Sequence, residues 1–450
     1  MIRYIVPFLS ILLVGCSPSK KDELTYFGGK IINPKSDNVT LYDHNDEVID
    51  TIKLNPDNTF TGAFKDFKPG LYMFRHGTEY QHIFLEPKDS LLIRLNTWDF
   101  DESLVFSGTN AHRNNLLVET FLANEEQEKN FYKYFKLAPN EFMHKIDSLK
   151  NIKDKYLEKY LADNENVSEQ YVDILKIALY FPLYKKIEAF IIDNSLKETP
   201  ENLSDAFTAH RKDINIGKDS LMFFPPYRLY VFNNLYSNIY EQNIKDDSDD
   251  FTIALLNSID KRINSEELKN KLLKQTTIRH FYKKTSCNMN KKAYQTFLSL
   301  STNENDKKDI SLLLNDVKGI VKNRKLPNFK VLTPQGSLEN ITDIIKNEKA
   351  VIYFRNREYS SDAWVASRVN FLINNNPNVE FLVINIGDDQ KQYIKDLNIK
   401  YQFFLKNNSK AHQFLTSKYP RTVLVNKKGI VINNFCSIAG KKFQKQLSEL

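Results

Sequence analysis

Residues 350–386 read AVIYFRNREYSSDAWVASRVNFLINNNPNVEFLVINI, and this stretch decides the fold of the last third of the chain. Ala350–Phe354 is an apolar run typical of a strand buried on both faces. A helix is expected next, because apolar residues recur near its 3.6-residue period: Trp364, Val365, Val369, Phe371 and Leu372. Val379–Ile386 is again mostly apolar and predicts a second buried strand. A strand, a helix and a strand in this order indicate an α/β arrangement.

The sequence that follows extends this arrangement to the end of the chain. Lys391–Leu397 has the pattern of another helix, and Lys441–Leu450 that of a final short one. Between them, Arg421–Asn426 and Gly429–Asn433 flank Asn-Lys-Lys-Gly, which predicts a hairpin. We therefore expect an α/β domain with a mixed sheet over residues 319–450.

Residues 109–318 are predicted to be helical. One helix face is expected directly after Pro225-Pro226, since proline suits the first turn of a helix, and comprises Leu229, Phe232, Leu235 and Ile239. Another stripe runs over residues 172–179. Pro182 is expected to kink or end that helix, because it cannot donate the backbone hydrogen bond of the helix interior.

Residues 25–108 carry short β-prone segments separated by Asn, Asp, Pro and Gly turn residues. The segments are Val39–Tyr42, Val48–Ile52, Asn58–Gly62, Leu71–Phe74, His82–Leu85 and Leu91–Leu95. Short strands at this spacing favour a small β-sandwich. The expected fold class is therefore an α+β multidomain chain, with a β-sandwich, a helical region and an α/β domain.

The amino terminus contains Leu13-Val14-Gly15-Cys16 after an apolar run from Tyr4 to Val14, with Arg3 in front. The run is much shorter than the roughly 20 residues that a membrane-spanning helix needs, so it indicates a signal peptide. The four residues resemble a bacterial lipobox. That resemblance implies cleavage after residue 15, lipidation of Cys16 and a tether over 16–24, so that a lipid anchors the chain to a membrane. An ordinary secretory signal with an accidental cysteine is the alternative.

Composition excludes several classes of function. The 63 basic and 56 acidic residues are spread along the chain and give a net charge of +7, without a basic stripe, so we expect no nucleic-acid partner. The sequence contains no HxxxH, no Cys/His cluster of metal spacing and no phosphate-binding glycine motif. We assign no catalytic residue, metal ligand or cofactor.

Four segments carry a resemblance to a known family. They are an entry segment at Leu326–Gly336, the strand at Val351–Phe354, the proline loop at Tyr419–Thr422 and the turn at Asn426–Val431. Together they resemble a thioredoxin-like domain of the TlpA type, in which the proline corresponding to Pro420 is cis. The β-rich segment resembles a domain that often precedes a thioredoxin-like domain in lipoproteins of the Bacteroidota.

One departure from this family concerns its chemistry. Thiol–disulfide exchange needs two cysteines separated by two residues at a helix N-terminus. The corresponding stretch, Arg357–Ala363, contains no cysteine. In one register Glu358 and Ser361 take the two positions; in the other, Ser360 and Ala363 do, and the sequence does not choose between them. The domain is therefore expected to be redox-inactive.

These observations predict an envelope lipoprotein whose thioredoxin-like domain binds a peptide or protein. The candidate partner-binding residues lie on two loops that meet in the thioredoxin fold: Tyr359, Ser360, Ser361, Tyr419, Pro420 and Arg421. One alternative is a thiol–disulfide oxidoreductase that uses Cys287 or Cys436; another is a structural accessory lipoprotein of an export or uptake system. The expected location is the outer membrane, facing the periplasm or exposed at the cell surface. Lys20–Glu23 resembles the surface-export signal of Bacteroidota lipoproteins; a solvated tether without such a signal is the alternative interpretation.

Overall fold

The structure is a computed structural model of the 450-residue chain, and it describes residues 24–244, 246, 248–283, 291–386, 394–399, 401–417, 419–440, 443–448 and 450. The expected signal peptide, the Cys16 lipidation site and all but the last residue of the tether lie outside the described residues, as does Cys287. The chain divides into two compact units. The first unit comprises Met1–Phe190, Leu203–His210 and Ser220–Val231, and the second comprises Ile191–Asn202, Arg211–Asp219 and Phe232–Leu450.

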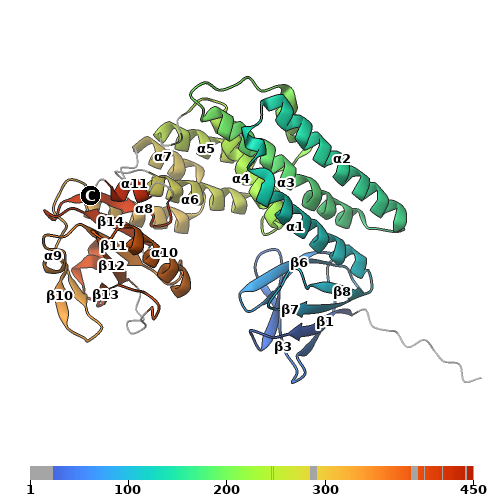
Figure 1. Ribbon diagram of the computed structural model, residues 1–450, viewed down its shortest axis with the longest axis horizontal. Coiled ribbons are helices and arrows are strands. Elements are labelled where there is room, and N and C mark those ends of the chain that lie inside the picture. The colour runs from blue at the N-terminus through green and yellow to red at the C-terminus, as the bar shows by residue number, and fades with distance from the viewer. Residues whose placement is uncertain are drawn as a thin grey trace, which may run out of the picture. The chain divides into compact units, whose positions relative to one another are not determined.

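The first unit begins with two four-stranded sheets (Figure 1). Their orders are β4-β1-β7-β8 and β3-β2-β5-β6. The strands are β1 Thr25–Ile32, β2 Asn38–Tyr42, β3 Val48–Lys53, β4 Thr59–Phe64, β5 Gly70–His76, β6 Glu79–Leu85, β7 Ser90–Asn96 and β8 Val105–Gly108. Side chains from both sheets form one core, in which the Phe27 ring lies 5.5 Å from those of Phe60 and Phe74. This is the β-sandwich that the alternating segments predict.

Glycine permits one close approach within this sandwich. Strand β1 runs parallel to β7, with Gly29 opposite Ile93. Gly29 has φ +147°, and a Cβ there would lie 2.0 Å from the carbonyl oxygen of Ile93. Any larger residue would push the two strands apart, so this position requires glycine.

Three long helices follow: α1 Ala111–Phe131, α2 Pro139–Asp163 and α3 Glu169–Ser195, of which α3 runs from the first unit into the second after Phe190. Two adjacent asparagines join α1 to the sandwich. Asn114 accepts a hydrogen bond from the Phe84 amide at 2.7 Å and donates one to the Phe84 carbonyl at 2.9 Å. Asn115 pairs in the same way with Phe106, at 2.9 and 3.0 Å. Because β6 and β8 are edge strands, α1 covers one edge of each sheet.

Pro182 does not end α3, which continues for 13 residues beyond it to Ser195. Proline cannot donate to the carbonyl of Ala178, one turn earlier. The side-chain amide of Asn124 on α1 donates to that carbonyl instead, at 3.0 Å. Asn124 thus satisfies the carbonyl of Ala178, which the proline leaves without a donor. The two residues are 54 positions apart in sequence, so no local pattern could have shown this.

Helix α4 starts at Pro225, as expected, and extends over Pro225–Tyr240. The second unit contains four further helices: α5 Asp249–Arg262, α6 Glu266–Lys283, α7 Lys291–Leu300 and α8 Glu304–Gly319. Helices α6 and α8 pack against each other, and α6 also contacts strand β15 of the sheet that follows. None of the helices in the described part of the chain combines the length and apolar character needed to cross a membrane.

A seven-stranded mixed sheet of order β10-β9-β13-β12-β11-β14-β15 completes the second unit. Its strands are β9 Lys330–Leu332, β10 Leu338–Asn340, β11 Ala350–Arg355, β12 Glu380–Asn385, β13 Tyr401–Phe404, β14 Arg421–Val425 and β15 Val431–Cys436. Strands β11, β12 and β13 are parallel neighbours, while β14 and β15 form an antiparallel hairpin. Helices α9 Ile341–Ile344, α10 Asp362–Asn375 and α11 Phe443–Leu447 complete this part, and each face of the sheet has its own apolar core.

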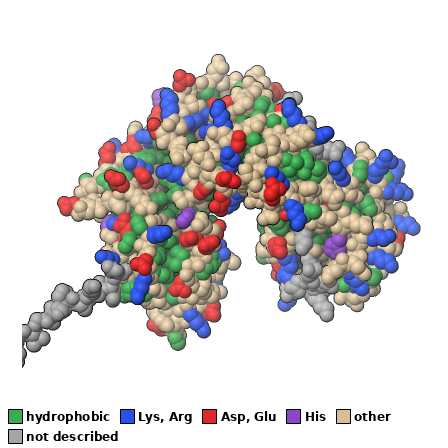
Figure 2. All heavy atoms as spheres, turned by 180° about the vertical axis from the view of Figure 1, so that it is seen from behind, with side chains coloured by type: hydrophobic (Ala, Val, Ile, Leu, Met, Phe, Trp, Pro, Cys, Tyr) green, Lys and Arg blue, Asp and Glu red, His purple; other side chains and the backbone are tan. Residues whose placement is uncertain are grey.

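This arrangement contains the strand–helix–strand unit and the terminal hairpin that the sequence predicts, so the chain has a mixed α+β fold. One expected helix is wrong where it can be seen. Within Lys391–Leu397, the described residues from 394 form a turn and no helix, and residues 391–393 lie outside the described residues. The final helix is shorter than expected. Figure 2 shows both acidic and basic side chains on the sandwich and on the helices, and mainly basic ones on the visible face of the mixed-sheet part.

Candidate functional site

The loop between β11 and α10 holds Tyr359, Ser360 and Ser361, three of the residues predicted to bind a partner. Ser361 is the N-cap of α10, and its hydroxyl accepts a hydrogen bond from the Trp364 amide at 3.3 Å. The helix therefore starts at Asp362, with Ser360 and Ala363 next to its N-terminus. Glu358 lies earlier, in a turn. The described residues of this loop and of the first turn of α10 include no cysteine, so this segment cannot exchange disulfides.

A buried arginine that the sequence analysis missed fixes this loop. Arg355 donates to the Ser360 carbonyl at 3.0 Å and to Asn385 at 3.2 Å, and it forms an ion pair with Asp362. The negative charge of Asp362, in the first turn of α10, also interacts favourably with the helix dipole and so stabilises the helix start. The available signal was an arginine directly after an uninterrupted apolar strand, a place where an unpaired charge would be costly.

The proline loop lies beside this loop, as the family resemblance implies. The Tyr359 and Tyr419 rings are 5.4 Å apart. Burial raises the pKa of Tyr419 to about 12, so its hydroxyl is neutral at ordinary pH. The carbonyl of Pro420 accepts a hydrogen bond from the Tyr282 hydroxyl on α6 at 2.5 Å. The carbonyl oxygen of Pro420 is thus already occupied by a hydrogen bond from helix α6.

The expectation of a cis Pro420 is wrong: no peptide bond between described residues is cis, and the Tyr419–Pro420 bond is trans. Nor does Arg421 point towards a partner. Its side chain is 1% exposed and donates to the carbonyls of Asp316, at 3.0 Å, and Phe414. Arg421 supports the loop from inside, because β14 is buried on both faces and directs this side chain into the core.

Asp316, near the end of α8, anchors the residues just before the proline loop. One carboxylate oxygen accepts hydrogen bonds from the Thr416 amide at 2.7 Å and its hydroxyl at 2.6 Å. The other accepts from the Ser417 amide at 2.9 Å and its hydroxyl at 2.5 Å. These four bonds satisfy the buried carboxylate and fix the path of the loop.

Two aromatic side chains on α10 are exposed, although the sequence analysis grouped them with the helix's apolar residues. Trp364 is 41% exposed and Phe371 54% exposed, while Val365, Val369 and Leu372 form the buried side. Arg368 lies between them on the same face, with its guanidinium 5.6 Å from the Phe371 ring. We call Trp364, Arg368 and Phe371 the aromatic face. Tyr359, in the loop before α10, is also exposed, at 53%.

The remaining candidate residues have structural partners. Ser360 lies 3.4 Å from the Tyr353 hydroxyl, and Ser361 caps the helix. Cys436 is buried, donates from its sulfur to the Thr422 carbonyl at 3.3 Å, and has a pKa raised by that burial, which disfavours the reactive thiolate. Within the described residues, no group of His, Cys, Asp and Glu side chains is arranged to hold a metal ion.

Comparisons with known proteins give likenesses to part of the chain. No family model matches it, and no curated protein does. A solved thioredoxin-like protein from Bacteroides caccae is 11% identical, with a TM-score of 0.31, over 53% of this chain and 89% of its own. A candidate thiol-disulfide oxidoreductase from Bacteroides vulgatus is 14% identical, with a TM-score of 0.25, over 29% and 96%. The C-terminal domain of another from Bacteroides thetaiotaomicron is 21% identical, with a TM-score of 0.23, over 29% and 97%.

Proposed function

We propose that this chain is a membrane-anchored envelope lipoprotein whose thioredoxin-like domain binds a protein or peptide partner without redox chemistry. The observation that carries the proposal is the segment Arg357–Ala363, which leads into α10 and contains no cysteine in either register of the family motif. The fold supplies the loop, the helix N-terminus and the proline loop, while the chemistry that defines redox members is missing. Binding is the function that such a domain can still perform.

The redox part of the proposal is tested with the insulin assay. Purified protein, with dithiothreitol as electron source, is expected to leave insulin disulfides intact, because Cys436 is buried and α10 begins without sulfur. Treatment of the native protein with a thiol reagent should leave Cys436 unmodified. Insulin reduction at the rate of a true thioredoxin would overturn the proposal in favour of an oxidoreductase.

The proposed binding surface combines the two loops with the aromatic face. Tyr359, Ser360, Ser361, Tyr419 and Pro420 form the loop pair, with Arg421 in a supporting role beneath it. Trp364 and Arg368 add residue types that are enriched in binding hot spots. Exposed rings on one helix face gain free energy when a partner removes them from water.

A photo-crosslinking side chain at position 367, on α10 between Trp364 and Phe371, tests the surface in cells. The expected result is one dominant crosslinked envelope protein or peptide. The double variant Trp364→Ala/Phe371→Ala should weaken its capture by about 2 kcal/mol or more, with no loss of folding. Leu338→Ala, an exposed apolar residue of the same unit outside this surface, serves as the matched control and should change nothing. Equal capture by both variants would contradict the binding surface.

The membrane anchor is proposed from the lipobox at Cys16, with the outer membrane as the location and the periplasmic or the outer face as the orientation. Cys16→Ala should block processing or release the protein from the membrane fraction. Normal cleavage and unchanged membrane association of this variant would contradict the anchor. Protease accessibility in intact cells distinguishes the two faces.

A further inference from the structure

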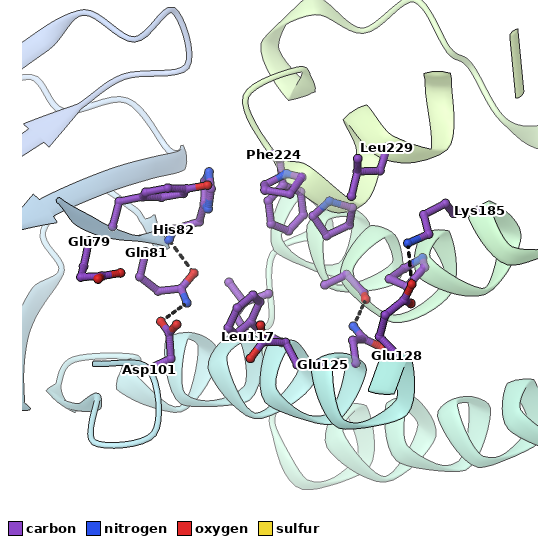
Figure 3. A pocket seen from close by; sticks show the side chains of 17 residues that line it. Glu79, Gln81, His82, Asp101, Leu117, Glu125, Glu128, Lys185, Phe224 and Leu229 are labelled. Atoms are coloured by element: carbon purple, nitrogen blue, oxygen red, sulfur yellow. Dashed lines mark hydrogen bonds and ion pairs between the residues drawn. The ribbon is translucent and has the colours of Figure 1, made fainter. Parts of the chain in front are cut away.

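The first unit contains a cavity of about 400 Å³ between strand β6 and helices α1, α3 and α4 (Figure 3). All of its lining residues belong to this unit. Its volume lies in the range of small-molecule sites. It is separate from the proposed partner surface, which lies in the second unit.

The walls of the cavity are mainly apolar. Leu117 and Phe121 contribute from α1, while Phe224, just before α4, and Pro226 and Leu229 of α4 line the opposite side. Leu229 is 43% exposed although it is a large aliphatic residue at a helix start. A ligand with an apolar body would cover these side chains and gain hydrophobic free energy.

Three carboxylates also line the cavity: Glu79, Asp101 and Glu125. None of them forms an ion pair with another residue of the described chain. Asp101 accepts a hydrogen bond from Gln81 at 2.9 Å, and its pKa is raised by burial and by the negative charges of Glu125, Glu102 and Glu79. The carboxylates thus repel one another, and a positive charge among them would relieve this repulsion.

On the opposite side of the cavity, the carboxylate is paired with lysines. Figure 3 shows Glu128 and Lys185 there, away from Glu79 and Asp101. Glu128 forms ion pairs with Lys185, at 3.2 Å, and with buried Lys186. The asymmetry defines the ligand: an apolar body against the helices, with a positive group directed to the β6 side.

We propose that this cavity binds a small amphipathic cation, consisting of an aromatic or aliphatic body with one ammonium or guanidinium group. The same chemistry occurs in free organic amines and in the side chains of lysine and arginine in a peptide. We name the site the acidic cavity. It does not depend on the function proposed for the thioredoxin-like domain.

Calorimetric titration of the full chain tests this proposal, with phenethylammonium as the probe. Phenethyl alcohol is the neutral analogue of similar shape, and 3-phenylpropionate is the anionic one. The ammonium is expected to bind at least about tenfold more tightly than the alcohol at low salt, and the difference should shrink at high salt. The capped peptide acetyl-Phe-Lys-amide distinguishes the sources: its competition with the probe shows that a peptide side chain also fits, and its failure restricts the site to free amines.

Variants locate the binding within the molecule. Asp101→Asn/Glu125→Gln removes two of the three charges and keeps the acceptor for Gln81, so the affinity for phenethylammonium should fall about tenfold or more. Leu229→Lys places a tethered ammonium at the cavity wall and should abolish binding; the exposure of Leu229 makes this change compatible with folding. Glu126→Gln removes the negative charge of an exposed neighbour outside the cavity; it is the control for a charge change nearby and should have little effect.

Three outcomes would overturn the proposal. The first is the absence of saturable binding of phenethylammonium up to about 10 mM, since weaker binding is not specific recognition. The second is equal affinity for the ammonium and the alcohol, and the third is binding that survives both cavity variants. In either of the last two cases the carboxylates would play no part.

Discussion

Asp316 is the residue on which the proline loop depends most directly. Its carboxylate is buried and accepts four hydrogen bonds from Thr416 and Ser417. Asp316→Ala leaves two partly buried main-chain amides and two hydroxyls without their acceptor, so we expect a loss of about 3 kcal/mol in the free energy of unfolding. Urea denaturation measures this loss. Asp316→Asn, which retains one acceptor oxygen, should lose less, and a wild-type midpoint for the alanine variant would show that water replaces the carboxylate.

Lys153 provides a test of burial through pH. Its side chain is buried, its ammonium donates to Asn124 at 2.8 Å, and burial lowers its pKa to about 8. Between about pH 8 and pH 10.5 the unfolded chain keeps the proton that the native protein has lost, so the free energy of unfolding should rise with pH.

Comparison with Lys153→Met isolates this effect, because the variant has no ammonium to titrate. The difference in unfolding free energy, wild type minus variant, should increase by roughly 3 kcal/mol across that range. Urea denaturation at several pH values measures it. A flat difference would mean that Lys153 reaches water in the native protein.

Among the secondary-structure elements, α3 offers a test of how a helix contains proline. Asn124 supplies the donor that Pro182 lacks, at the carbonyl of Ala178. Asn124→Ala should therefore cost more in the wild type than in a Pro182→Ala background, where a main-chain amide can bond Ala178 again. We expect a coupling energy of about 1 kcal/mol from the double-mutant cycle, measured by urea denaturation.

The cycle also contains its own control. Asn124→Ala removes the acceptor of Lys153 in both backgrounds, so the loss of that bond cancels in the coupling energy. A coupling energy near zero would mean that the Asn124–Ala178 bond does not compensate for the proline.

The same elements show what the sequence could reveal. Short-range patterns predicted strands β2 to β7 of the sandwich but not β1 or β8, and they predicted the start of α4 at Pro225 and the hairpin of β14 and β15. Each of these features depends on neighbours in sequence. The patterns failed where the structure depends on residues distant in sequence. Helix α3 continues beyond Pro182 because Asn124 bonds the carbonyl of Ala178, and Trp364 and Phe371 are exposed because no other element covers this face of α10 among the described residues.

The candidate site divides in the same way. The absence of sulfur at the start of α10 is visible in the sequence, and so is the pairing of the two loops once the family resemblance is recognised. The orientation of Arg421 is not visible in the sequence. It depends on the carbonyls of Asp316 and Phe414, which accept its hydrogen bonds and which the fold brings to this place. The acidic cavity combines residues 79 to 229, whose proximity only the fold creates.

For the molecule as a whole, the thioredoxin-like region is predicted to depend on the helices before it. Asn434 donates to the carbonyls of Val317, at 3.0 Å, and Ile320, and Tyr282 bonds Pro420. A fragment of residues 319–450 loses Asp316 and Tyr282 and exposes apolar surface of β15. We expect it to aggregate or to show reduced cooperativity in thermal unfolding followed by circular dichroism.

A fragment of residues 266–450, which restores α6 to α8, is the matched comparison and should unfold cooperatively. If the shorter fragment unfolds with the same midpoint as the longer one, the helices contribute nothing to the stability of this region.

The asparagine pair on α1 has a consequence for sequence divergence. Asn114 and Asn115 bond only main-chain atoms of Phe84 and Phe106, which any residue except proline would offer equally well. The side chains of the edge strands can therefore be substituted almost freely during evolution without loss of the hydrogen bonds that join the strands to α1. The asparagines cannot, since aspartate would accept but not donate, and a longer amide would not reach both atoms in the same geometry. Distant descendants of this architecture should be recognisable by two adjacent asparagines at the start of the first helix, long after their strands have ceased to resemble one another.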